Sequence, residues 1–395
     1  METNGETNGK LLARLSGLLV ENDIGVARLT PRPRRGRLSG EPQWEVERVL
    51  AALEAFVPVG PSLVYGNGCF AVGRYADSAA VYRRVLEHEP AQPEARFNLG
   101  LAYLRLKRPR EALGEFTTVI GRDPSLAEAY YQRGNTYDDL GERELALADY
   151  GRAIGLKPDY LQAWYNRGVA LARLGRHDEA VKDFDRVIDL RPTLSNAYLN
   201  RGASLDELGQ HRQAIADYST AVQRDPYSAD AFFNRARTQY HLGHLEEAVS
   251  DYSQVIKLSP EDSEAFNNRG LAFDALGDYR LAMEDYGWAL ALRPNFAEAR
   301  TNRGAALEAE GHVADALTDY LETLATTPDF AAAHYNAARL YSRKGDLDRC
   351  VQHLEEAVRL APQFWVEAAE DENLGWVMEL RRLQRERQSN GEGEG

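Results

Sequence analysis

The sequence predicts an all-α solenoid of tandem helix–turn–helix repeats, and three features of the 395-residue chain support this prediction. Glycines recur at two fixed places of each repeat. They are followed by an alanine, an aromatic residue and an aliphatic residue, and then by a proline. The proline itself returns nine times at intervals of 34 residues, at Pro90, Pro124, Pro158, Pro192, Pro226, Pro260, Pro294, Pro328 and Pro362. A fixed period of this length indicates one supersecondary unit copied in tandem, each copy packing against its neighbours.

The first helix of each repeat is predicted from small residues at fixed places. Counted from residue 59, nine repeats fill residues 59–364, and the eighth place is Gly in seven repeats and Ala in two. A residue without a long side chain lets two helices approach closely. The fifteenth place is Gly in eight repeats, with Lys107 as the exception. Glycine there suits the left-handed residue that ends a helix.

The second helix is predicted from residues four apart. In repeat three these are Ala146, Tyr150 and Ile154, at places 20, 24 and 28, and Pro158 follows. Spacings of four put the three side chains on one helical face, where the small residue makes room for a large one of a neighbouring helix. Proline after the last turn prevents the helix from continuing.

An aromatic residue also stands at the fourth place of five repeats, as Tyr130, Trp164, Tyr198, Phe232 and Phe266. The order of residue types in the repeat is this aromatic residue, then Gly, Gly, Ala, a second aromatic residue and Pro. Over residues 59–364 this pattern resembles the tetratricopeptide repeat family. The resemblance implies a right-handed superhelix whose first helices line a concave groove through places 2, 5, 6, 9, 12 and 13.

The flanks of the repeats are expected to cap the array. Residues 1–40 are expected to be a flexible segment, with a short helix from about Leu11 to Val20, and residues 389–395 a disordered tail. An amphipathic capping helix is predicted over 41–58, with Trp44 and Leu50 on its apolar side. A second capping helix is predicted over 365–388, with Trp376 on its apolar side.

Composition narrows the class of partner. The net charge of −14 and the pI of about 5.2 favour solubility and argue against nucleic-acid binding. The two cysteines, Cys69 and Cys350, stand eight repeats apart, so reduced thiols and a cytoplasmic location are expected. No apolar run approaches the roughly 20 residues that a membrane span needs, and the opening residues lack the pattern of a signal peptide.

Place 6 carries a carboxamide in eight repeats, and we call these residues the asparagine row: Asn98, Gln132, Asn166, Asn200, Asn234, Asn268, Asn302 and Asn336. An amide side chain offers a donor and an acceptor, so it can bind an extended peptide backbone irrespective of sequence. The row is similar to the asparagine ladder of the O-linked N-acetylglucosamine transferase repeat domain, which holds peptide backbone. The alternative is that these amides serve bonds within or between repeats.

A row of arginines and a row of carboxylates also recur. Arginine recurs at place 7 and could form a track that binds phosphate groups. Acidic residues recur at place 23 of almost the same repeats, which suggests instead arginine–carboxylate pairs between the two helices of a repeat. The second interpretation is favoured. The residues are Arg133, Arg167, Arg201, Arg235, Arg269 and Arg303, with Asp149, Asp183, Asp217, Asp251, Asp285 and Asp319.

Other groove places differ between repeats, and selectivity is expected there. Aromatic residues at place 5 would accept apolar side chains of a ligand: Phe97, Tyr131, Tyr165 and Phe233. The acids Asp138, Asp206 and Asp274 at place 12 would select basic side chains, unless they are merely solvated.

The sequence therefore predicts a non-enzymatic adaptor that holds an extended polypeptide, with no catalytic, cofactor or metal residues. No phosphate-binding loop, Gly-x-Ser-x-Gly turn or third ligand beside His241 and His244 is present. One alternative is an assembly scaffold that uses its convex face or its caps. Another is a regulator with residues 1–40 as a docking arm. Partner identity and oligomeric state do not follow from the sequence.

Overall fold

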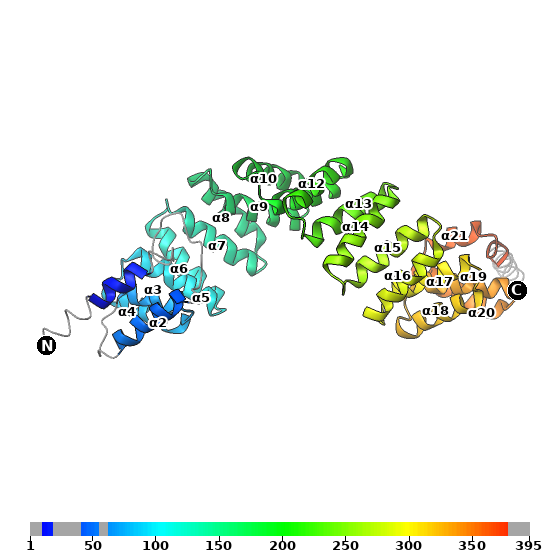
Figure 1. Cartoon of the computed structure of the whole chain (residues 1–395), viewed down its shortest axis with the longest axis horizontal. Helices are drawn as coiled ribbons and strands as arrows, with labels where there is room; N and C mark the ends of the chain where they lie inside the picture. The colour runs from blue at the N-terminus through cyan, green and yellow to red at the C-terminus, as the bar shows by residue number, and fades with distance from the viewer. Residues whose placement is uncertain (1–9, 19–40, 55–61, 378–395) are drawn as a thin grey trace, which may run out of the picture. The chain divides into compact units, whose positions relative to one another are not determined.

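The computed structural model describes residues 10–18, 41–54 and 62–377, and throughout these residues the regular structure is helical. The chain divides into two compact units, residues 1–208 and residues 209–395. In each unit, consecutive helices pack against one another in chain order (Figure 1).

The helices of the first unit follow a helix over residues 10–18. They are α2 (Glu41–Glu54), α3 (Leu63–Ala71), α4 (Tyr75–His88), α5 (Pro93–Arg105), α6 (Pro109–Arg122), α7 (Ala127–Asp139), α8 (Arg143–Leu156), α9 (Leu161–Arg173), α10 (His177–Leu190) and α11 (Ser195–Glu207). The second unit contains α12 (His211–Arg224), α13 (Ala229–His241), α14 (Leu245–Leu258), α15 (Ser263–Ala275), α16 (Tyr279–Leu292), α17 (Ala297–Ala309), α18 (Val313–Thr326), α19 (Ala331–Arg343), α20 (Leu347–Leu360) and α21 (Phe364–Glu370).

The glycine at place 8 is explained by the aromatic ring at place 24 of the same repeat. A Cβ added to Gly304 would lie 2.5 Å from Tyr320 Cε1, and one added to Gly270 would lie 2.7 Å from Tyr286 Cε1. Gly66, Gly100, Gly134 and Gly168 meet the ring of their own repeat in the same way. The second helix thus packs its largest side chain directly on the backbone of the first, which fixes the hairpin.

The turn inside each hairpin needs a left-handed residue. The glycine at place 15 has a φ between 73° and 87° in eight repeats. In repeat two the same conformation is held by Lys107, with a φ of 60°. An L-residue adopts this conformation at a cost, so repeat two carries local strain that the other repeats lack.

The N-terminal cap is larger than predicted. Residues 10–18 are helical, and Leu15 and Leu18 are buried in one apolar cluster with Val46 and Leu50 of α2. This part of the segment 1–40 is therefore packed rather than flexible. The prediction for Trp44 is wrong, because its side chain is 72 % exposed. The remainder of 1–40, residues 55–58 of the predicted first cap and the tail 389–395 lie outside the described residues.

The C-terminal cap also differs from the prediction of one helix over 365–388. The short helix α21 ends at Glu370, and after a turn the chain is helical again from residue 375. Leu374 and Val377 are buried against repeat nine, while Trp376 is 42 % exposed. Residues 378–388 of the predicted cap lie outside the described part of the chain.

Candidate functional site

Arginine–carboxylate pairs tie the first helix of a repeat to its second. In repeat seven, Arg269 Nε donates to Asp285 Oδ2 and Arg269 Nη2 donates to Asp285 Oδ1, both at 2.7 Å. The same two bonds, at 2.7–2.8 Å, occur in Arg133–Asp149, Arg167–Asp183, Arg235–Asp251 and Arg303–Asp319. Arg201 and Asp217 belong to different units, so their pairing stays a prediction.

The remaining guanidinium nitrogen links consecutive repeats. Nη1 of several arginines donates to the residue at place 25 of the preceding repeat, at distances of 2.6–3.2 Å: Arg133 to Thr117, Arg201 to Asp185, Arg235 to Ser219 and Arg269 to Ser253. These donors are therefore engaged inside the fold, which argues against an open phosphate track.

Two repeats replace the arginine–carboxylate pair. In repeat two, where place 7 is Leu99, Arg96 at place 4 donates from Nη1 to Glu115 Oε2 at 2.8 Å. This exchange was not predicted from the sequence, although an arginine at a place that is otherwise mostly aromatic was a signal of it. In repeat nine, His334 and His353 occupy places 4 and 23, with their Nδ1 atoms 2.9 Å apart.

The asparagine row faces partly into the protein. Four of its amide groups donate to a side chain of the preceding repeat: Asn98 to Asn67 Oδ1 at 3.1 Å, Asn166 to Asn135 Oδ1 at 2.8 Å and Tyr131 Oη at 3.1 Å, Asn200 to Tyr165 Oη at 2.8 Å, and Asn302 to Asn267 Oδ1 at 3.1 Å. Asn98 is only 1 % exposed. The predicted groove contact is therefore wrong for Asn98, because Asn67 and the N-terminal repeats enclose it.

Asn268 Oδ1 accepts a bond of 3.1 Å from Asn267 Nδ2, but other members of the asparagine row keep free hydrogen-bonding capacity. In the described part of the chain, Gln132, Asn234 and Asn336 make no side-chain hydrogen bond, and all three are half-buried. The Oδ1 atoms of Asn166, Asn200 and Asn302 receive no donor from the described residues. These amides can therefore accept backbone N–H groups, but most of their own donors are committed between repeats.

The aromatic residues at place 5 have one side in the core. Each is half-buried and packs against the place-24 ring of its own repeat, with centroid separations of 5.6 Å for Phe97–Phe116, 6.1 Å for Tyr131–Tyr150, 6.0 Å for Tyr165–Phe184 and 5.6 Å for Phe233–Tyr252. Only the remaining part of each ring lies on the surface made by the first helices, which we call the first-helix face.

The acids at place 12 are not equivalent. Asp138 Oδ2 accepts a bond of 3.0 Å from Arg173, and Glu308 accepts bonds of 2.9 Å from both Arg339 and Arg343. Asp206 also has an interaction. By contrast, the side-chain carboxylate of Asp274 has no ion-pair or hydrogen-bond partner among the described residues, although Asp274 is half-buried. Burial raises the pKa of the Asp274 carboxyl, as expected for a carboxylate removed from water without a cation.

A buried hydroxyl without a partner lies within electrostatic reach of Asp274. The place-24 tyrosine normally donates to an acceptor near the first-helix face, as Tyr82 does to Asn67 at 2.7 Å and Tyr150 does to Asn135 at 2.9 Å. Tyr286 is fully buried, and its Oη has no hydrogen-bond partner in the described residues. Burial raises the pKa of the Tyr286 hydroxyl, and the negative charge of Asp274 raises it further.

The first-helix face ends before repeat nine. Tyr335 stacks on Phe364 of the C-terminal segment, with ring centroids 4.7 Å apart and planes at 19°. Ser342 Oγ donates to the backbone oxygen of Asn373 at 2.5 Å, and Trp376 Nε1 donates to Ser342 Oγ at 3.2 Å. The C-terminal segment therefore covers places 5 and 12 of this repeat.

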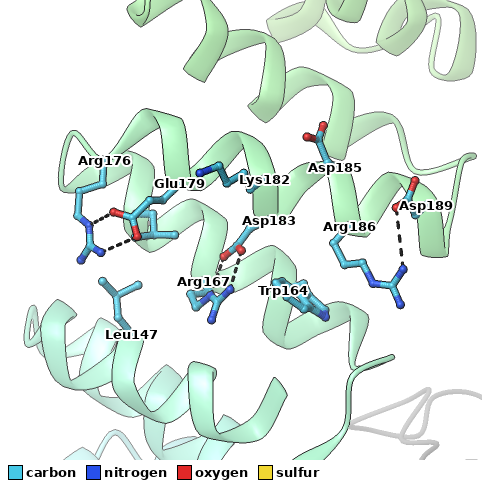
Figure 2. Close-up of a pocket in the computed structure, with 11 residues that line it drawn as sticks. Leu147, Trp164, Arg167, Arg176, Glu179, Lys182, Asp183, Asp185, Arg186 and Asp189 are labelled. Carbon is cyan, nitrogen blue, oxygen red and sulfur yellow. Dashed lines mark hydrogen bonds and ion pairs between the residues drawn. The ribbon is translucent and has the colours of Figure 1, made fainter. Parts of the chain in front are cut away.

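A hollow of about 650 Å³ lies between α8, α9 and α10 of the first unit. Figure 2 shows Trp164 and Arg167 of α9 at its floor, with charged side chains of α10 along one side. Arg167 lies over the Trp164 ring at 4.8 Å from the centroid while it holds Asp183 with two bonds. Leu147 and Leu171 complete the lining at one end.

No helix within the described residues is long and apolar enough to cross a membrane. In the same part of the chain, no three His, Cys, Asp or Glu side chains gather where they could hold a metal ion. Cys69 and Cys350 are buried and are not joined in a disulfide.

Repeated helical hairpins, tied by partly buried arginine–carboxylate pairs, define a helical repeat protein. The profile of the tetratricopeptide repeat matches residues 70–127, 131–195, 199–263, 263–296 and 331–364. These segments together span more than half of the sequence. The chain belongs to the tetratricopeptide repeat family, whose members bind protein partners.

Solved structures are similar in fold. The C-terminal part of a TPR repeat-containing protein from Cytophaga hutchinsonii superposes with a TM-score of 0.51 at 20 % identity, covering 59 % of this chain and 95 % of that one. YrrB, a TPR protein with an unusual peptide-binding site, gives a TM-score of 0.42 at 24 % identity, covering 47 % and 95 %. PilW, a type IV pilus biogenesis factor, gives 0.47 at 25 % identity, covering 53 % and 97 %. No curated protein sequence matches this chain.

Proposed function

We propose that this protein is a cytoplasmic, non-enzymatic adaptor that binds an extended peptide along the first-helix face of repeats six to eight, with a basic side chain of the peptide at Asp274. The observation that carries the proposal is the half-buried, unpaired Asp274 carboxylate. A carboxylate in this state loses hydration without gaining a cation, so a lysine or arginine of a ligand would supply the missing charge.

The neighbouring residues supply contacts to the rest of a peptide. Asn234 is half-buried and makes no side-chain hydrogen bond in the described part of the chain, so its amide is open to a peptide group. Asn302 offers its Oδ1, because its Nδ2 is committed to Asn267. Phe233 leaves part of its ring on the same face for an apolar side chain.

Selection of random 12-residue peptides displayed on phage, using the whole chain as bait, tests this function. Enriched sequences should contain Lys or Arg at a fixed place, and their affinity for Asp274→Asn should fall at least tenfold. Asp278→Asn, an exposed acid of the same repeat without a side-chain cap bond, is the matched control and should leave affinity unchanged.

A second pair of changes separates the backbone contacts from the charge. Asn234→Ala combined with Asn268→Ala should weaken all enriched peptides, basic or not, while helical circular dichroism persists. Peptides that bind equally well to the Asp274 and asparagine variants would show that the first-helix face is not the binding site.

An assembly scaffold is the second candidate function, favoured by the tryptophan of the N-terminal cap. Trp44 on α2 is 72 % exposed, so its ring is accessible to an apolar side chain of a second protein. Trp44→Ser should reduce the mass of any assembly measured by size-exclusion chromatography with light scattering. An unchanged mass would remove this observation as support.

A further inference from the structure

The hollow between α8, α9 and α10 is separate from the first-helix face of repeats six to eight, and it belongs wholly to the first unit. Its lining along α10 runs from Arg176 to Asp189. At a rise of 1.5 Å per residue this distance is roughly 20 Å, which is long enough to receive several turns of a helix. A volume of about 650 Å³ is enough for several anchoring side chains.

A glycine of α8 lies next to Arg167, one of the residues that line the hollow. Gly151 stands at place 25 of repeat three, where other repeats carry residues such as Thr117 or Asp185. A Cβ added to Gly151 would lie 3.6 Å from Arg167 Nη1, so a longer side chain at this position would extend over Arg167. With glycine, the stacked Trp164 ring and Arg167 guanidinium remain uncovered beside Leu147.

The charges of the hollow leave one cation unpaired. Arg167 is held by Asp183, Arg176 donates to Glu179 at 2.7 and 2.8 Å, Arg186 lies 3.9 Å from Asp189, and Asp185 accepts from Arg201 at 2.6 Å. Among the described residues, Lys182 alone of the charged lining has no ion-pair partner, and it is exposed. Figure 2 shows its side chain on α10 between the Arg176 and Arg186 pairs.

We infer that this hollow is a second interaction surface, which receives an amphipathic helix of a partner protein that carries an acidic residue beside its apolar anchors. The apolar side chains lie over Trp164 and between Leu147 and Leu171. The carboxylate of the partner pairs with Lys182. Apolar contact in the hollow provides affinity, and the single unpaired cation fixes the orientation of the helix.

A library of displayed helical peptides tests this inference. Each member is an alanine-rich helix of 16 residues with one randomised face. Selection uses the whole chain as bait, and members that also bind the Gly151→Leu variant are removed. Enriched members should carry Asp or Glu next to large apolar residues. Enrichment without an acidic residue, or no enrichment at all, would overturn the inference.

Defined variants then locate the contact. Lys182→Glu should weaken the enriched peptides at least tenfold, and replacing the acid of the peptide by lysine should restore binding to that variant. Gly151→Leu should abolish binding, because the added side chain would extend over Arg167, which lines the hollow. Peptides that bind Lys182→Glu as tightly as the native chain would contradict the assignment.

The controls come from the second unit. Gly287 occupies place 25 of repeat seven, and a Cβ there meets no atom within 4 Å, so Gly287→Leu should fold normally and leave binding unchanged. Lys257→Glu makes the same charge change at an exposed position of α14. Because the proposed peptide site lies on repeats six to eight, Asp274→Asn should not alter binding of the helical peptides, which keeps the two proposals separable.

Discussion

Lys107 offers a direct test of how this chain forms its hairpins. Its φ of 60° places an L-residue in the conformation that glycine holds in the other eight repeats. Left-handed geometry costs an L-residue about 1–2 kcal/mol. Glycine would remove that cost but would lose about 0.4–1 kcal/mol through the greater freedom of the unfolded chain. Lys107→Gly should therefore stabilise repeat two by about 0.5–1 kcal/mol.

The assay must resolve single repeats, because a repeat array does not unfold as one unit. Native-state hydrogen exchange of amides in α5 and α6 gives the local free energy of opening, and urea unfolding gives the total. Gly141→Lys, the reverse change in repeat three, should cost a similar amount, since Gly141 has a φ of 81° and no atom within 4 Å of an added Cβ. If Lys107→Gly left exchange in α5 and α6 unchanged or faster, the strain argument would be refuted.

Two further predictions concern the pairs inside repeats. Asp285→Asn leaves the Arg269 guanidinium with an uncharged partner in a largely buried position. The free energy of unfolding, measured by urea titration, should therefore fall by about 2–3 kcal/mol. The control Glu284→Gln changes an exposed residue of the same helix and should alter this free energy by less than about 0.5 kcal/mol. Burial, with a smaller contribution from the charge of His334, lowers the pKa of His353 from 6.5 to about 4. The folded chain therefore binds fewer protons than the unfolded chain, and stability should decline as pH falls from about 6.5 towards 4. His353→Gln should flatten this slope in thermal melts, and an identical slope would be evidence against His353.

The fold follows from the sequence because its signals are local and repeated. A 34-residue period, a glycine that must accept an aromatic ring and a glycine with positive φ each recur in most repeats, so one misread position does not change the prediction. The arginine–carboxylate pairs could be predicted for the same reason. An arginine and an aspartate 16 residues apart recur together in repeats three to eight. The shift of the donor from place 7 to Arg96 at place 4 in repeat two was harder to predict, because it occurs once.

The candidate site depended more on tertiary contacts. Every member of the asparagine row has the same place in the sequence, yet Asn98 is enclosed and Asn234 is free of side-chain bonds. The acids at place 12 look alike in the sequence, but Asp138 is paired with Arg173 and Asp274 is not. Whether a polar group is available depends on the residue one repeat away, which the local pattern does not specify.

The repeat, its two helices, its turn and the residues of its core could be predicted from the sequence alone, because these depend on periodicity and on steric limits within about 34 residues. The tertiary structure was needed to show which polar groups remain unpaired, that the C-terminal segment covers repeat nine, and that a hollow lies beside Trp164. The physical reason is that packing within a hairpin is set by neighbours along the chain, whereas pairing and exposure are set by side chains that meet only after the hairpins stack.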